Sequence, residues 1–350
     1  MHDRLKDSRF LKACRGEPTD ATPIWLLRQA GRYLKEYREI KSRCDSFLQF
    51  CKTPDLAAQV TVDAQRILGV DAAILFADLL PILEPMGLRL EYLEGEGPLI
   101  ANPVRTAADV DALRLEEPEQ SMPFVHETIR RARAELPPDI PLIGFAGAPF
   151  TLASYAVEGQ GSKHFAITKT LMYQDVGAWH ELMQKLSRTV GDYLAGQIAA
   201  GVQAVQIFDS WVGCLGPADY RRYALPYTKA VIDEIGGRVP VIHFGTGAAS
   251  FMEAMHEAGA DVLGFDWRTP IAPVWDRLGC TAVQGNLDPI ALCADLATVK
   301  KKAQEVLDDV GGRAGHIFNV GHGLVPKTEV ENVIALVDYV HETTDRRRAR

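Results

Sequence analysis

The chain has 350 residues, of which 47% are hydrophobic and 24% charged, and its formal net charge is −8. This is a globular composition, and its acidic balance argues against a nucleic-acid partner, which favours basic surfaces. The segment Met1–Pro18 lacks the apolar core of a secretory signal, and no run reaches the ~18 apolar residues of a membrane span, so we expect neither export nor a membrane partner.

Eight short apolar runs recur along the chain and predict buried parallel strands. Each run is too short for a helix, and its nearly continuous apolar character suits a strand that is covered on both faces. In chain order the eight runs are Ile24–Leu27, Ala72–Ala77, Leu142–Ala146, Ala204–Phe208, Val241–Phe244, Val262–Phe265, Ala282–Gln284 and His316–Val320.

The segments between these runs carry helical signals. The triplet Thr53-Pro54-Asp55 predicts an N-cap followed by proline in the first turn, and Gly69 predicts the end of that helix. Apolar residues recur at helical spacing from Val330 to Val340. Gly201 and Gly259 stand where the helices before the fourth and sixth strands should end.

Eight βα repeats favour an α/β fold in which residues 1–350 form a single-domain (β/α)8 TIM barrel. A doubly wound open sheet is the alternative. The stretch Gly87–Pro103 interrupts the rhythm, and its apolar residues around Gly95 and Gly97 predict a small β-hairpin insertion after strand two. Six cysteines without a CxxC pair predict free thiols in a reducing compartment, so we expect a cytoplasmic protein.

Chemistry in such barrels lies in the loops that follow the carboxyl ends of the strands. The first of these loops is Arg28-Gln29-Ala30-Gly31-Arg32. Two guanidinium groups that converge there suit bidentate binding of carboxylate or phosphate, and we expect an anion with several charges. The alternative is a pair of surface arginines that form ion pairs with Glu36 or Glu39.

Asp78 follows the second apolar run, and a carboxylate in such a stretch is costly to bury without a partner. It predicts a carboxylate in an apolar pocket that accepts donors from a ligand. The alternative is an aspartate that caps local amides at the strand end. A metal site would offer more oxygen ligands nearby, and we expect none here.

Three further residues follow other strands. Tyr155 and Ser210 are weak signals alone, because a tyrosine after a turn is more often a packed residue with a satisfied hydroxyl. His322 stands between two glycines, which expose its ring and let the backbone approach a ligand, so we expect it to bind ligand or carry a proton. Gly245-Thr246-Gly247 favours a tight turn over a phosphate loop, and no P-loop motif is present.

Taken in order, these motifs resemble the uroporphyrinogen decarboxylase family over nearly the whole chain. The segment from Pro23 to Leu34 is the most specific. The other matching motifs are Phe76-Ala77-Asp78, Gly147-Ala148-Pro149-Phe150-Thr151-Leu152, Tyr155-Ala156-Val157-Glu158-Gly159, Phe208-Asp209-Ser210, Gln284-Gly285-Asn286-Leu287-Asp288-Pro289 and Asn319-Val320-Gly321-His322-Gly323.

The resemblance implies a homodimeric carboxy-lyase that needs no cofactor and converts the four acetate side chains of uroporphyrinogen III to methyl groups, giving coproporphyrinogen III. The Arg28–Arg32 loop, with Gln29, Ala30 and Gly31, would contact substrate carboxylates. Asp78 would accept the pyrrole N–H groups of the tetrapyrrole. Tyr155, Ser210 and His322 would hold further substrate side chains, with Arg28, Asp78 and Tyr155 as the catalytic set. Two positions, Asp209 and Lys41, differ from some family members, and this leaves the rim of the site open.

The proton donor stays open between Tyr155, His322 and a carboxyl of the substrate, because arginine is a poor acid. Two other functions are alternatives to a decarboxylase. A thiol methyltransferase of the same superfamily would need a zinc-binding His-x-Cys pair, and here the stretch is His243-Phe244-Gly245, so that His243 and Cys280 alone are insufficient. A tetrapyrrole carrier without activity would need the arginines but not Asp78.

Overall fold

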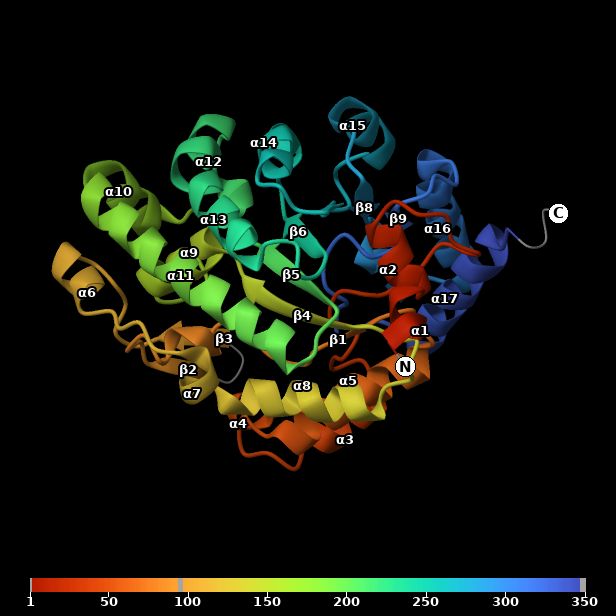
Figure 1. Cartoon of the computed structure of the whole chain (residues 1–350), viewed down its shortest axis with the longest axis horizontal. Helices are drawn as coiled ribbons and strands as arrows, with labels where there is room; N and C mark the ends of the chain where they lie inside the picture. The colour runs from red at the N-terminus through yellow and green to blue at the C-terminus, as the bar shows by residue number, and fades with distance from the viewer. Residues whose placement is uncertain (1, 94–96, 347–350) are drawn as a thin grey trace.

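The computed structural model describes residues 2–93 and 97–346. Seven parallel strands form one curled sheet, and helices surround it on the outside, as in a TIM barrel (Figure 1). The order of strands in the sheet is β1-β4-β5-β6-β7-β8-β9. Their bounds are Ala73–Ile74 for β1, Leu142–Gly147 for β4, Ala204–Asp209 for β5, Val241–Gly245 for β6, Val262–Gly264 for β7, Ala282–Gln284 for β8 and His316–Ile317 for β9.

Each of the last seven predicted runs contains one of these strands, whereas the first run, Ile24–Leu27, does not form a regular strand. Its ladder is limited to one parallel bridge between Ile24 and Phe318, just beyond β9. On the other side the Asp71 amide donates to the Ile24 carbonyl at 2.8 Å, so this segment lies between the two outer strands of the sheet.

The first predicted run forms one parallel bridge and no regular strand, because its backbone leaves the extended conformation early. The amide of Leu27 donates to the Asn319 side chain at 3.0 Å rather than to a strand carbonyl. The amide of Leu26 donates to the side chain of Gln29 at 3.4 Å. Arg28 then adopts a left-handed conformation with φ 61°, which ends any ladder.

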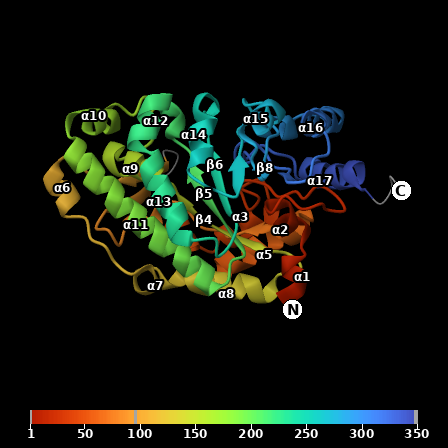
Figure 2. The same ribbon diagram turned by 45° about the horizontal axis from the view of Figure 1, so that its top comes forward.

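Helices and 3-10 turns connect and cover the strands. In Figure 2 the helices α12, α13 and α14 stand outside β4, β5 and β6. The α-helices are α1 (His2–Lys6), α2 (Arg9–Cys14), α3 (Lys35–Lys41), α4 (Phe47–Cys51), α5 (Pro54–Leu68), α6 (Ala107–Asp111), α7 (Pro118–Ser121), α8 (Pro123–Glu135), α9 (Pro149–Glu158), α10 (Ala166–Gln174), α11 (Val176–Ala200), α12 (Pro217–Tyr223), α13 (Leu225–Ile235), α14 (Met252–Glu257), α15 (Ile271–Leu278), α16 (Leu296–Val310) and α17 (Val330–Thr344). The 3-10 turns are η1 (Pro81–Leu83), η2 (Val212–Cys214), η3 (Ala249–Phe251) and η4 (Pro289–Cys293).

The predicted helix boundaries hold with small differences. Helix α5 begins after Thr53, whose hydroxyl donates back to the Gln49 carbonyl at 2.8 Å instead of capping α5. Gly69 ends α5 and Gly201 ends α11, both in the left-handed conformation that glycine adopts without strain. Gly259 lies beyond the end of α14, which stops at Glu257.

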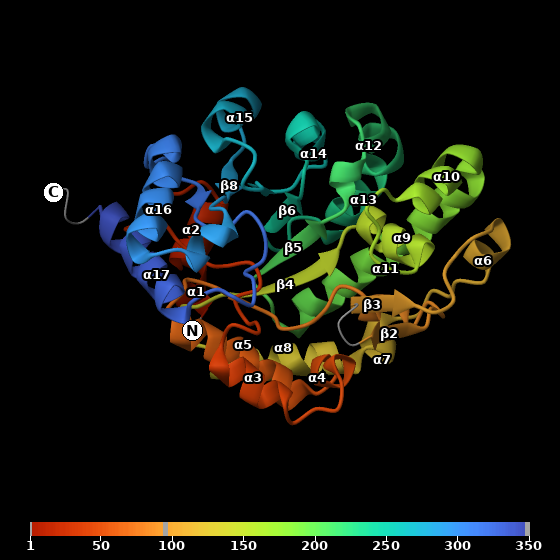
Figure 3. The same cartoon turned by 180° about the vertical axis from the view of Figure 1, so that it is seen from behind.

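Between β1 and α8, two further strands pair with each other outside the main sheet. Strand β2 (Leu90–Leu93) runs antiparallel to β3 (Gly97–Ile100), with Tyr92 opposite Pro98. Figure 3 shows this pair close to α4, and β2 contacts α4. The predicted turn at Gly95 lies outside the described residues.

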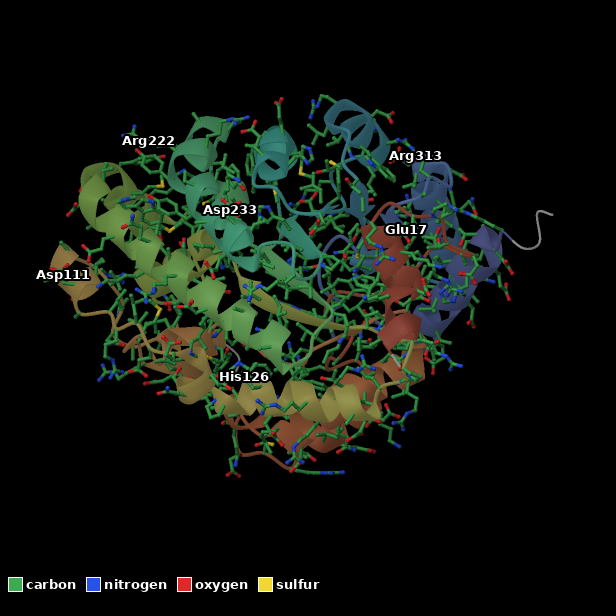
Figure 4. All side chains as sticks on the ribbon, viewed as in Figure 1. Glu17, Asp111, His126, Arg222, Asp233 and Arg313 are labelled. Carbon is green, nitrogen blue, oxygen red and sulfur yellow. The ribbon has the colours of Figure 1, made fainter. Side chains whose placement is uncertain are left out.

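The buried apolar side chains form one core between the sheet and its helices. Charged side chains such as Arg222 and Arg313 lie on the outer helical layer (Figure 4). Among the described residues, no helix is both long and apolar enough to cross a membrane.

A buried ion-pair network joins the amino-terminal helix to the start of the sheet. The Arg9 guanidinium donates to Asp20 at 2.7 Å and to Asp71 at 2.6 Å. The other oxygen of Asp71 accepts from the Ile24 amide at 2.7 Å and lies 2.7 Å from Nε2 of His341 on α17. One carboxylate therefore ties α2, α17 and the first predicted strand together.

Candidate active site

The side chain of Arg28 lies across the glycine that follows His322. Arg28 is exposed, and a Cβ at Gly323 would overlap its Cγ and Cδ atoms. The amide of Leu324 donates to the Leu27 carbonyl at 3.0 Å, which fixes the two loops against each other. Glycine is therefore required at position 323 for the guanidinium to keep this position.

The remainder of the arginine loop divides into a buried and an exposed part. The Gln29 side chain is fully buried and its amide donates to the Ala72 carbonyl at 3.3 Å, so it ties the loop to the strand β1. The Gln29 carbonyl accepts from the Tyr33 hydroxyl at 2.6 Å. Ala30 and Gly31 are partly exposed and lie between Gln29 and the exposed Arg32.

The alternative that the two arginines form surface ion pairs receives no support. Among the described residues, neither Arg28 nor Arg32 has a carboxylate within 4.0 Å, and Glu39 pairs instead with Lys35 at 3.5 Å. The charge of Arg32 acts on Tyr37, whose pKa burial raises to about 12. Both guanidinium groups are thus available to an anionic ligand.

Asp78 follows β1 and is partly buried. Its Oδ1 accepts a hydrogen bond from the Leu80 amide at 2.9 Å, which agrees with the alternative that this aspartate caps local amides. Burial raises the pKa of the Asp78 carboxyl, while the Tyr92 hydroxyl, the Leu80 amide and the Arg28 charge act in the opposite direction. Asp78 is therefore a local cap whose carboxyl also lies near cationic and hydroxyl groups.

Tyr155 lies in the second turn of α9, the helix that follows β4, and packs edge-on against Trp211 with 5.7 Å between ring centroids. Burial and then the negative charge of Asp78 raise the pKa of Tyr155 to about 12. Trp211 also packs against Phe165 at 5.4 Å, and Ser210 precedes Trp211 in the loop after β5, where it is partly buried. The phenol of Tyr155 is therefore neutral at physiological pH and can donate a hydrogen bond.

His322 follows the last strand in the loop Gly321-His322-Gly323. Its ring lies edge-on to Trp267 at 6.0 Å, and a Cβ at Gly321 would overlap the backbone of Trp267. Burial, and then the positive charge of Arg28, lower the pKa of His322. The imidazole is therefore neutral at pH 7.

The positive charge of Arg28 affects three predicted site residues that lie on different elements. Arg28 lowers the pKa of Asp78, of Tyr155 and of His322. Because the influence of a charge weakens with distance, this common effect indicates that the loops which carry these residues lie near one another. Arg32 lies in the same loop as Arg28, and Ser210 lies in the separate loop after β5; no hydrogen bond or ion pair joins either side chain to this group among the described residues.

Tyr92 is the residue of this group that the sequence did not single out. It lies on β2, in a stretch where it counts only as an apolar member of the predicted hairpin. Its hydroxyl is close enough to Asp78 to lower the pKa of that carboxyl. No local pattern marks a tyrosine in a hairpin as part of a site that is built after other strands.

The glycine turn after β6 contacts a carboxylate of the protein itself. The two residues considered as zinc ligands, His243 and Cys280, also lie near other side chains. The Gly247 amide donates to the Asp266 carboxylate at 2.6 Å, so it is not free for a phosphate, in agreement with the tight-turn interpretation. His243 Nε2 lies 3.8 Å from Asp209, and Cys280 Sγ lies 3.6 Å from His256 Nδ1. In the part of the chain that is described, no three His, Cys, Asp or Glu side chains are grouped to hold a metal.

Comparison with known proteins identifies the family. The family model described as uroporphyrinogen decarboxylase (URO-D) matches residues 5–343. Proteins named uroporphyrinogen decarboxylase from Sorangium cellulosum and Carboxydothermus hydrogenoformans are 52% and 53% identical to this chain. The alignments cover 97% of this chain and 96% of the former protein, and 95% of both chains for the latter.

A solved structure shows the same fold at low identity. A methyltransferase from Methanosarcina mazei superimposes with a TM-score of 0.79 and 20% identity, over 96% of this chain and 98% of the other. At that identity the likeness concerns the fold alone. The family model and the relatives that are about half identical cover nearly the whole chain, and the chain therefore belongs to the uroporphyrinogen decarboxylase family.

Proposed function

We propose that this chain is a carboxy-lyase that decarboxylates the four acetate side chains of uroporphyrinogen III to methyl groups and releases coproporphyrinogen III, without a cofactor. Membership of the family supports the reaction. The single structural observation that supports it is the partly buried Asp78 carboxyl, which interacts electrostatically with Arg28 and Tyr155.

The reaction needs an electron sink, and the pyrrole ring supplies it. A proton adds to the ring carbon next to the acetate-bearing carbon, and the ring becomes cationic. The carbon–carbon bond to the carboxylate breaks, CO2 leaves, and the bonding pair neutralises the ring. The exocyclic methylene then takes a proton and the ring carbon loses one, so each acetate consumes one proton in total.

Asp78 suits the stabilisation of that cation. A fixed anion gains interaction energy as the ring becomes positive, and in a site shielded from water this electrostatic contribution is commonly the largest one in catalysis. The Asp78 carboxylate would accept the pyrrole N–H groups at the centre of the macrocycle. Burial raises the pKa of the Asp78 carboxyl, whereas the Arg28 charge and hydrogen-bond donors favour its ionised form.

The arginine loop and the other polar residues suit the holding of carboxylates. Arg28 and Arg32 are exposed, carry no protein carboxylate among the described residues, and would bind substrate side chains in bidentate fashion. Gln29, Ala30 and Gly31 would contribute through the loop backbone, since the Gln29 side chain is already bonded within the fold. The neutral donors Tyr155, Ser210 and His322 would complete the cradle, and Tyr155, His322 and a substrate carboxyl remain the candidate proton donors.

The proposal also covers the closure of the barrel, the oligomeric state and the cellular compartment. The bridge at Ile24 and the hydrogen bond from Asp71 support a closed eight-stranded barrel, and the β2–β3 pair supports a hairpin insertion. We further propose one domain over residues 1–350 and a homodimer, as the family resemblance implies. Six unpaired cysteines fit the reducing cytoplasm.

Anaerobic turnover tests the function. Uroporphyrinogen III is incubated with the purified chain and with the variant Asp78→Asn, and the products are separated by their number of carboxylates. We expect intermediates with seven, six and five carboxylates, then the four-carboxylate product, from the wild type alone. Binding of the tetrapyrrole without any loss of carboxylates would support the carrier alternative and overturn the proposal.

A further inference from the structure

Tyr92 carries a buried hydroxyl with no hydrogen-bond partner of ordinary geometry among the described residues. A buried phenol normally finds a partner, because an unsatisfied hydroxyl has lost its hydrogen bonds to water without replacement. The ring itself is held firmly: it packs edge-on against Phe47 of α4 at 5.1 Å, and Tyr92 pairs with Pro98 across the β2–β3 ladder. The hydroxyl is thus fixed in place but unused.

The group that this hydroxyl faces is Asp78. The negative carboxyl of Asp78 is the largest cause, after burial, of the raised pKa of Tyr92. In return the Tyr92 hydroxyl is the strongest influence that opposes the burial of Asp78 and lowers the pKa of its carboxyl. Oδ1 of Asp78 already accepts the Leu80 amide, so the Tyr92 hydroxyl would be a second donor at the same carboxylate.

We propose that Tyr92 is a positioning residue for Asp78, whose hydroxyl donates a hydrogen bond to the carboxylate when substrate fills the site, and so orients it and keeps it ionised. This inference rests on the proposed function, because it assigns Tyr92 a part in the same reaction. A tetrapyrrole that displaces water from Asp78 would strengthen the bond, since hydrogen bonds to a charged acceptor gain strength as water leaves.

Apart from His322, the groups around Asp78 keep their charge in the range where the carboxyl titrates. Arg28 stays protonated. The remaining titratable groups are neutral at acid and neutral pH, because burial raises their pKa values: they are Tyr155 on α9, Tyr37 on α3, Cys51 on α4 and Tyr193 on α11. His322, whose pKa burial and the Arg28 charge lower, is present in the wild type and in every variant, so its contribution is common to all of them. A difference between wild type and a Tyr92 variant therefore reports on Asp78.

The test is the pH profile of kcat/KM for uroporphyrinogen with the wild type and Tyr92→Phe. Phenylalanine keeps the ring contact with Phe47 and removes only the hydroxyl. We expect the acid limb of the profile to move to higher pH by about one unit, the size of one hydrogen bond to a charged group. Well above that limb, activity should stay within about threefold of wild type, whereas below it kcat/KM should fall about tenfold.

Two further variants keep the test decisive. Tyr92→Met, which also lacks the hydroxyl, should show the same shift if Tyr92→Phe folds poorly. Tyr339→Phe is the matched control, because its hydroxyl bonds to Gln304 at 2.7 Å on the outer helices, and its profile should match wild type. An unshifted limb, or a uniform loss at every pH, overturns the inference while the decarboxylase function stands. A wild type without turnover at any pH overturns both.

Discussion

The backbone of Arg28 allows stability and activity to be separated at one position. Its φ of 61° is a left-handed conformation that costs an L residue about 1–2 kcal/mol and glycine nothing. The greater conformational entropy of glycine in the unfolded chain offsets about 0.5–1 kcal/mol of this advantage. We therefore expect Arg28→Gly to be about 0.5–1 kcal/mol more stable than Arg28→Ala, which keeps the strain.

Both variants should lose activity to the same degree, because both lack the guanidinium. Removing one partner of a charged pair that becomes buried in a complex costs about 2–5 kcal/mol, which is about 30-fold to several-thousand-fold in kcat/KM. Loss of the Arg28 charge also raises the pKa of Asp78, which adds to the deficit at acid pH. Arg28→Lys should recover only part, because an ammonium cannot form the bidentate contact.

Two measurements decide this prediction. Urea unfolding gives the free energies of unfolding of wild type, Arg28→Gly and Arg28→Ala, and anaerobic turnover gives kcat/KM on substrates with eight to five carboxylates. An Arg28→Gly protein that is less stable than Arg28→Ala would refute the assignment of backbone strain. Wild-type activity in both variants on every substrate would refute the assignment of the site.

The remaining predictions concern charge, protonation and metals. Asp78→Asn should keep the wild-type melting temperature and lower kcat by about 10²–10³, the loss expected for a removed electrostatic stabiliser, and a turnover above a tenth of wild type would contradict its role. Burial and then the Arg28 charge lower the pKa of His322, so Arg28→Ala should raise that pKa, measured by NMR titration of the imidazole C–H signals, and an unchanged titration would place the two groups apart. Arg9→Ala should cost about 1.5–3 kcal/mol in urea unfolding, since it removes bonds to two carboxylates, whereas the exposed pair of Arg15 should be worth about 0–1. Dialysis against a chelator should leave turnover unchanged, and restoration of a lost activity by added metal would argue for a bound ion.

Local patterns were enough to predict most of the strands and the loops that carry the site. An apolar run of four to six residues between helical segments specifies a buried strand, because only that arrangement covers both of its faces. The order of strand, loop and helix then places Asp78 after β1 and Tyr155 after β4 without any knowledge of distant contacts. The arginine loop and His322 follow from the same reasoning, and the family motifs name the chemistry.

Tertiary packing decided which groups meet and in what conformation. Arg28 is left-handed and crosses Gly323, almost three hundred residues away, and the Asn319 side chain takes the amide of Leu27 that a strand would have used. The approach of Tyr92 to Asp78 depends on how the β2–β3 pair packs against α4. These contacts join segments far apart in sequence, and the periodicity of a segment encodes its own burial but not the identity of the surface that buries it.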